Sequence, residues 1–161
     1  MSDEKRYLVR AGEAPSQTLS HPLNENSEIE CEMLSRIAGM QRIGVNRTTI
    51  PPGKESFIYH SHETEEEFIY VISGRGTLEA DNRKIEIGPG DFIGFPTPSI
   101  AHLVRNTFEE DLICLMGGEN KEAEVADFPR AGKRLFRGPD SAEVVDYEHI
   151  TKLANADSSD S

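Results

Sequence analysis

The chain has 161 residues, 36% of them hydrophobic and 29% charged, which is enough for one globular domain with a core but short for two. Acidic side chains outnumber basic ones by 29 to 17, so the net charge is −12. A surface of that sign repels phosphate backbones, which excludes nucleic acid as a partner.

Cysteine content and hydropathy predict a cytoplasmic protein without a membrane segment. The two cysteines, Cys31 and Cys114, are far apart and form no CxxC pair, so a disulfide framework is not expected. No apolar run approaches the ~18 residues that a membrane span needs. The first six residues also lack the apolar core of a signal peptide.

The first 40 residues predict an irregular N-terminal extension with a short helix near 28–37. From residue 41 to 118, glycine and proline turns divide the chain into segments rich in β-branched and aromatic residues. We predict strands at 42–50, 56–62, 67–73, 77–80, 84–87, 92–95, 101–105 and 111–116.

No helical pattern separates these predicted strands, which excludes a parallel βαβ sheet. Short strands at regular intervals predict an all-β antiparallel sandwich or jelly-roll barrel over residues 41–118. Residues 119–150 mix charge with isolated apolar groups and predict a C-terminal extension that packs on the barrel or on a partner subunit. Residues 151–161 have nothing to bury and predict a disordered tail.

Two histidines stand two residues apart in the segment predicted as a strand at 56–62. Side chains two apart on a strand project from the same face, so His60 and His62 can hold one divalent ion between them. The pair alone is weak evidence, because two polar residues on an exposed strand face have the same spacing.

The next strand adds a carboxylate. Glu67 shares a face with the apolar residues Ile69 and Val71, which places an acid at the mouth of an apolar interior. Such an acid is costly unless a positive charge compensates it, and a metal ion supplies one. Glu65 and Glu66 are alternatives, since the preceding turn could shift by one residue.

A third histidine, His102, follows the proline-rich segment 96–98. Three histidines and one carboxylate form the mixed nitrogen and oxygen set that suits one divalent ion of the Zn, Fe, Ni or Mn class. Such a set leaves one or two coordination positions open for water or substrate.

These residues resemble the two motifs of the cupin superfamily. The first motif is carried by Gly53, His60, His62, Glu67 and Gly74, and the second by Gly90, Pro96, His102 and Asn106. The sequence departs from the second motif at Pro98, where the family has glycine, and its loop to His102 is one residue longer. The resemblance implies a double-stranded β-helix, with short irregular or helical extensions and the metal held inside by His60, His62, Glu67 and His102.

Other residues are weaker candidates. Tyr59, Tyr70 and Arg47 reach a ligand only if their faces turn inward, and Asn106 is expected to tie a strand end by hydrogen bonds. Lone histidines are His21, in a loop, and His149, near the tail. Core positions are expected for the phenylalanines Phe57, Phe92, Phe95 and Phe108.

The resemblance implies a fold and a site but no particular reaction. We expect a metal-dependent enzyme of the oxygenase, isomerase, decarboxylase or lyase type that acts on a small polar molecule. The alternative is a non-catalytic protein that binds a sugar or a small carboxylate. A homodimer is also expected, because a barrel of this type exposes a sheet edge that is commonly covered.

Overall fold

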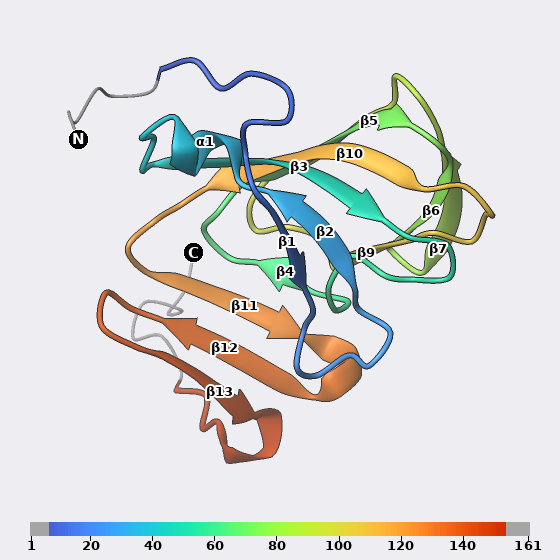
Figure 1. The fold of residues 1–161 in the computed structure, drawn as a ribbon. Coiled ribbons are helices and arrows are strands. Elements are labelled where there is room, and N and C mark those ends of the chain that lie inside the picture. Colours follow the sequence, from blue (N-terminus) through green and yellow to red (C-terminus); the bar gives the residue numbers. More distant parts are fainter. Residues whose placement is uncertain (1–6, 154–161) are drawn as a thin grey trace, which may run out of the picture.

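The computed structural model describes residues 7–153, and almost all of its regular structure is β-strand (Figure 1). The elements, in chain order, are β1 (Ser16–Leu19), β2 (Ile29–Glu32), α1 (Leu34–Ile37), β3 (Ile43–Ile50), β4 (Ser61–His62), β5 (Glu67–Ser73), β6 (Gly76–Ala80), β7 (Arg83–Ile87), β8 (Phe92–Phe95), β9 (His102–Arg105), β10 (Leu112–Glu119), β11 (Glu124–Phe128), β12 (Lys133–Arg137) and β13 (Ala142–Asp146). Single 3₁₀ turns follow β11 and β13. No helix among the described residues is long and apolar enough to cross a membrane.

The strands form two facing layers. One layer is a six-stranded sheet in the order β1-β2-β3-β10-β5-β8. The other combines β7-β6-β9 with β4-β11-β12-β13, and isolated pairings of His60 with His102 and of Glu55 with Arg105 join the two groups. All pairings between the named strands are antiparallel, and the two layers make a double-stranded β-helix, as the sequence predicted.

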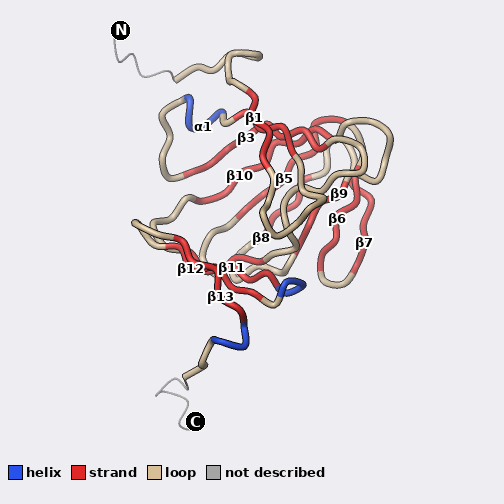
Figure 2. The backbone as a smooth tube through the Cα atoms, turned by 60° about the horizontal axis from the view of Figure 1, so that its bottom comes forward, coloured by secondary structure: helices blue, strands red, loops and turns tan. Residues whose placement is uncertain are grey.

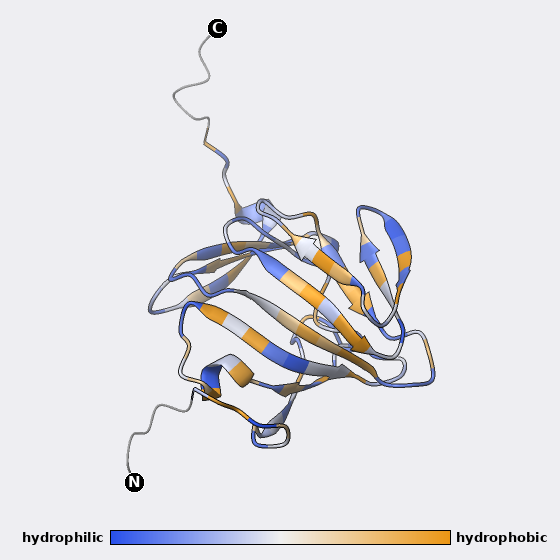
Figure 3. Ribbon diagram, turned by 90° about the horizontal axis from the view of Figure 1, so that it is seen from above, coloured by the Kyte–Doolittle hydropathy of each residue, from blue (hydrophilic) through white to orange (hydrophobic). Residues whose placement is uncertain are grey.

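The core lies between the layers, and hydrophobic and hydrophilic residues alternate along strands that enclose it (Figure 3). On β5, Ile69 and Val71 are 7% and 0% exposed, whereas Tyr70 and Ile72 between and beyond them are 41% and 44% exposed. Period-two alternation of this kind puts one face of the strand in the core and the other outside. The predicted inward face of residues 67, 69 and 71 is therefore confirmed.

The hairpin predicted at 81–83 joins β6 to β7. Asp81 and Asn82 both have positive φ, 49° and 57°, as the two-residue turn between twisted antiparallel strands requires. Aspartate and asparagine tolerate this conformation better than most residues, which explains why the turn could be predicted.

Two predicted elements differ from those in the structure. The helix predicted at 28–37 is the strand β2 followed by the four-residue α1, because Ile29 and Cys31 alternate into the core beside β3. The strand predicted at 56–62 is reduced to β4, and the residues before it are tied to β9 by isolated pairings instead.

The C-terminal extension is a sheet, where irregular or helical structure was predicted (Figure 2). β11 buries Glu124, Ala126 and Phe128. Because one of these three inward positions is an acid, the sequence of β11 does not show the alternation of apolar and polar residues that predicts a strand. The sheet packs on the barrel through its pairing with β4 and a small cluster of Ile58, Ala126 and Phe128. The disordered tail was predicted for residues 151–161, and from residue 154 on it lies outside the described residues.

Candidate metal centre

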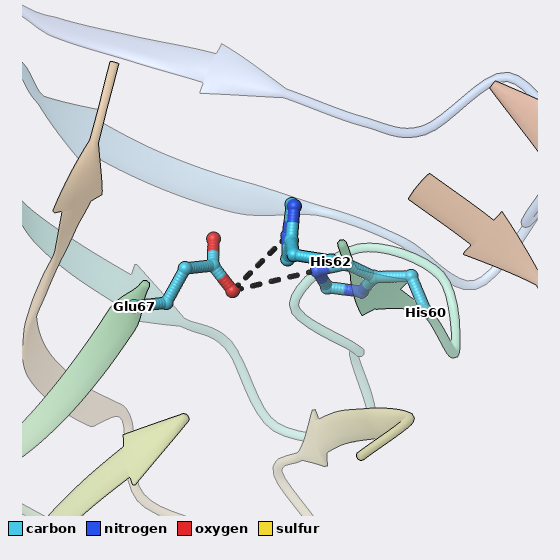
Figure 4. Close-up of side chains that lie close together, drawn as sticks. All are labelled: His60, His62 and Glu67. Atoms are coloured by element: carbon cyan, nitrogen blue, oxygen red, sulfur yellow. Dashed lines mark ion pairs between the residues drawn. The ribbon is translucent and has the colours of Figure 1, made fainter. Parts of the chain in front are cut away.

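Three imidazoles converge on one carboxylate oxygen. The Oε2 atom of Glu67 lies 3.2 Å from Nε2 of His62, 3.3 Å from Nε2 of His102 and 3.7 Å from Nε2 of His60. Figure 4 shows the side chains of His60 and His62 with Glu67 facing them from the start of β5. All four residues predicted from the sequence are therefore brought together.

Backbone pairing positions the histidines. His60 and His102 face each other across an antiparallel bridge, in which each amide donates to the other carbonyl over 3.1 and 2.8 Å. The loop before β9 is anchored on His62, because Ser99 Oγ accepts a hydrogen bond from the His62 amide and the Ser99 amide donates to the His62 carbonyl. These contacts hold the loop that departs from the cupin pattern at Pro98.

The tautomers of two histidines follow from their partners. Nδ1 of His60 lies 2.6 Å from the carbonyl of Ile58, and Nδ1 of His102 lies 3.0 Å from the carbonyl of Ile100. A carbonyl only accepts, so each Nδ1 carries the proton and the neutral ring presents an Nε2 lone pair to the centre. Hydrogen bonds of this kind orient histidines that ligate metals.

Packing fixes the remaining geometry. The ring of Phe95 stacks on the ring of His102 with centroids 3.5 Å apart and an interplanar angle of 10°.

Glu67 lies opposite Gly118 of β10, where an added Cβ would lie 3.0 Å from Glu67 Cγ and 2.8 Å from the Glu66 carbonyl oxygen. The position opposite Glu67 therefore accepts only glycine without displacing the carboxylate or the backbone.

Burial and charge set the protonation of the site. Burial acts to raise the pKa of Glu67, but the adjacent imidazoles of His102, His60 and His62 outweigh it and hold the pKa well below its usual range. Burial lowers the pKa of His102, which favours its neutral form. Burial also acts to lower the pKa of His62, yet neighbouring carboxylates, Glu67 foremost, leave it above the usual value.

A buried carboxylate behind His62 was not predicted from the sequence. Glu124 is 2% exposed, and its Oε1 lies 3.8 Å from His62 Nδ1. It also accepts hydrogen bonds from the amides of Glu63 and Thr64 and from the Thr64 hydroxyl, which keep it ionised and in place. No local signal marks this residue, since only the pairing of β11 with β4 brings it to the site.

The donor set fits a divalent metal. Neither ring nitrogen of His62 has a hydrogen-bond partner among the described residues although both atoms are buried, and a buried polar atom without a partner is costly. His60, His62 and Glu67 each offer a ligand atom within 4.8 Å of the others, and His102 adds a third nitrogen beside the same oxygen. Three nitrogens and one carboxylate suit Zn, Fe, Ni or Mn.

A cavity of about 240 Å³ inside the barrel reaches His60, Glu67 and His102. Its walls come from β3, β5 and β10 and from Arg137 at the end of β12. An ion held by the four side chains would therefore border a space of the size of a small polar molecule.

The other candidates do not face the three imidazoles. Glu65 lies near His62 and Glu124, but its carboxylate pairs with Arg137, and Glu66 is exposed. Arg47 pairs with Glu32 on the outer face of the barrel. Tyr59 lies under the guanidinium of Arg130, Tyr70 is on the outer face of β5, His21 packs on Phe128 and His149 is exposed.

Two further expectations had opposite outcomes. Asn106 is fully buried, and its amide group bonds to the backbone of Ile50, Glu110 and Phe108, which confirms its role at a strand end. The core position predicted for Phe92 is wrong, since this side chain is 67% exposed on the outer face. Its pairing with Tyr70 on β5, and not its hydrophobicity, decides its face.

The fold and the site together define a small single-barrel protein with a candidate metal centre in its interior, and known proteins share this plan. The family model described as a cupin domain matches residues 46–117. A provisionally assigned sugar phosphate isomerase from Acidithiobacillus ferrooxidans has a similar structure, with a TM-score of 0.91 and 36% identity, covering 95% of this chain and 100% of that one. The chain belongs to the cupin superfamily.

Two relatives are similar over parts of the sequence. The oxalate-binding protein of Thermotoga maritima is 28% identical over 114 residues, which cover 70% of this chain and 93% of that protein. An uncharacterised protein of Methanocaldococcus jannaschii is 39% identical over 57 residues. That second match spans only 35% of this chain and 44% of the relative.

Proposed function

We propose that the protein binds one divalent ion, Zn, Fe, Ni or Mn, through His60, His62, Glu67 and His102. The observation that supports this most strongly is the orientation of His60 and His102, whose Nε2 lone pairs face a carboxylate oxygen. Lone pairs and a carboxylate at that distance repel unless a positive charge lies between them. Protonating all three rings instead would crowd three cations, since the ring of His60 lies 4.9 Å from that of His62 and 4.6 Å from that of His102.

We further propose that the protein is a metal-dependent enzyme acting on a small polar molecule. A bound ion would act as a Lewis acid on a substrate oxygen. The chain's own residues would hold that ion, leave the cavity side of it open and keep bulk water out with the apolar walls at Ile69 and Met116. Isomerase chemistry is the first class to test, because the structural relative with 36% identity is a provisionally assigned sugar phosphate isomerase. Oxygenase, decarboxylase and lyase chemistry use the same site.

A second candidate function is non-catalytic binding of a sugar or a small carboxylate. The similarity to the oxalate-binding protein of Thermotoga maritima favours this alternative. In that case the ion would orient the ligand without changing it.

The test begins with protein purified without chelator and analysed for bound metals by mass spectrometry. One equivalent of a transition metal is expected, and a chelator-free preparation that takes up no such metal would contradict the proposal. Aldose and ketose phosphates in deuterated water then report isomerisation by nuclear magnetic resonance, and oxygen uptake is measured with small acids and diketones. Stoichiometric metal with ligand binding but no turnover would favour the binding protein.

We also propose that the protein is a homodimer that pairs through the outer face of β5 and β8. Tyr70, Ile72 and Phe92 are exposed there, and Phe68 stacks on Phe92. A molecule of net charge −12 repels a second copy least where it presents apolar side chains, as these four do. Sedimentation of the wild type and of Phe92→Glu tests this, and the variant is expected to be monomeric.

The cytoplasmic location stays a prediction. It is based on the two cysteines, Cys31 and Cys114, which are both free and buried.

A further inference from the structure

One basic side chain lines the barrel cavity. Among the described residues around that space, Arg137 is the single lysine or arginine, and it shares the cavity with His60, Glu67 and His102. It belongs to β12 in the C-terminal sheet, outside residues 46–117 that match the cupin domain. The extension therefore adds a charge to a cavity whose metal-binding candidates all come from the barrel.

Arg137 is fixed at one end and open at the other. Its Nη2 donates to Glu65 Oε1 and, over 3.1 Å, to the carbonyl of Lys121. Glu65 is itself held, because it is 5% exposed and accepts a hydrogen bond from the Lys121 amide over 2.6 Å. Within the described part of the chain, neither Nη1 nor Nε of Arg137 donates to a protein atom, so these donors remain for a ligand in the cavity.

The charges around the cavity leave room for an anion. Glu65 is neutralised by Arg137, and Glu119 is paired with Lys121 over 3.0 Å. Glu67 faces the proposed ion, and Glu124 lies behind His62 and does not line the cavity. Each carboxylate that lines the cavity therefore has a positive partner when the ion is bound, and none is left unpaired to repel a negative group on a ligand.

We infer that Arg137 binds the anionic oxygens of the ligand, a carboxylate or a phosphate, while the rest of the ligand faces the metal centre. The planar fork of a guanidinium matches two oxygens of either group and gives charge-assisted hydrogen bonds. This inference rests on the proposed metal site and narrows its ligand from a small polar molecule to a small anion. Arg137 would thereby distinguish anionic from neutral ligands.

Binding of oxalate and of inorganic phosphate to metal-loaded protein, measured by titration calorimetry, tests the inference. Arg137→Gln is expected to raise the dissociation constant of at least one of these anions by about tenfold or more. Arg137→Lys, which keeps the charge and loses the fork, is expected to lie between that variant and wild type. The anion whose affinity responds identifies the group that Arg137 binds.

Glu65→Gln is the matched control, because it breaks the same ion pair and leaves the guanidinium in place. If Arg137 binds anions, Glu65→Gln maintains or strengthens anion binding. If the pair is only structural, both variants lose affinity and stability together. Lys84→Gln removes an equal charge from an exposed side chain that does not line the cavity and is expected to change anion affinity little.

Two results would overturn the inference: wild-type protein loaded with metal that binds neither anion, or equal anion affinity in wild type and Arg137→Gln. The metal content of every preparation reports separately on the proposed function. A protein that takes up no metal rejects the metal site, whereas a metal-loaded protein indifferent to Arg137→Gln rejects only the anion contact.

Discussion

The barrel buries twelve apolar and thiol side chains in one cluster, whereas the cluster under the C-terminal sheet has three, Ala126 and Phe128 of the sheet with Ile58 of the barrel. The sheet compensates with ion pairs, which include a two-bond pair of Arg134 with Asp127 and a contact of Lys133 with Asp146. Apolar burial holds a fixed geometry at any pH, while ion pairs depend on pH and salt.

The two regions also contribute differently to the site. The four candidate ligands all come from the barrel, where pairing between strands fixes their spacing. The C-terminal sheet contributes Glu124 behind His62 and Arg137 in the cavity, which are charges that act on groups already in place. The barrel is thus expected to determine whether a metal binds. The C-terminal sheet is expected to determine the affinity for that metal and the kind of ligand that binds in the cavity.

The largest expected effect is on the barrel's ligands. The double variant His60→Ala with His62→Ala should reduce bound metal from one equivalent to background, because half of the four-atom donor set is removed. Both rings contribute little to the apolar core, so circular dichroism should still report a folded β protein. His149→Ala, a histidine change at an exposed position, is the control and should keep full metal content. A double variant that retains metal would reject the ligand assignment.

The next effect compares the two cores. Leu112 is fully buried in the barrel cluster, so Leu112→Ala should lower the free energy of unfolding by about 2–5 kcal/mol. Leu135 is half-buried against the cluster of the C-terminal sheet, and Leu135→Ala should cost less than half as much because water can reach the space it leaves. Urea denaturation measures both values. Equal losses would contradict the difference drawn between the two regions.

A smaller effect is expected at the carboxylate behind His62. Glu124→Gln keeps the shape and an acceptor oxygen but removes the charge that faces Nδ1, so metal affinity should fall by about 10- to 100-fold. Thr64→Val removes a hydrogen bond to the same carboxylate without touching His62 and should lower stability while leaving metal affinity unchanged. Competition with a chelating dye gives the metal affinities of both variants. If the two variants lose metal affinity equally, Glu124 serves only to hold the loop at Glu63 and Thr64.

The smallest expected effect concerns the acid sensitivity of the sheet. Hydrogen bonds from Arg134 hold the pKa of Asp127 below its usual value, with a further contribution from Tyr147. A carboxylate with a lowered folded-state pKa stabilises the fold above its unfolded-state pKa, and this stabilisation is lost as the pH falls through the folded-state value. Asp127→Asn should therefore cost about 1 kcal/mol at pH 7 and progressively less below about pH 4. Urea unfolding from pH 7 to 3 checks this, and a cost that grows on acidification would be the opposite of the expectation.

Much of the barrel could be predicted because its signals are local. The strand 67–73 and the hairpin at 81–83 follow from alternation and turn residues within a few positions. The spacing of His60, His62 and Glu67 is local as well, and the motifs around it resemble those of the family to which the chain belongs. Phe92 shows the limit of such signals, since an aromatic residue in a strand does not indicate which of two faces is covered.

The sequence by itself determined most strands and turns of the barrel and the four candidate ligands, because each depends on side chains and backbone preferences within one short segment. Only the tertiary structure decided that Glu124 lies behind His62 and that Arg137 reaches the cavity. Both depend on β11 pairing with β4 some sixty residues away, and the energy of that pairing comes from a buried acid, a few apolar contacts and ion pairs that leave no periodic pattern in the chain.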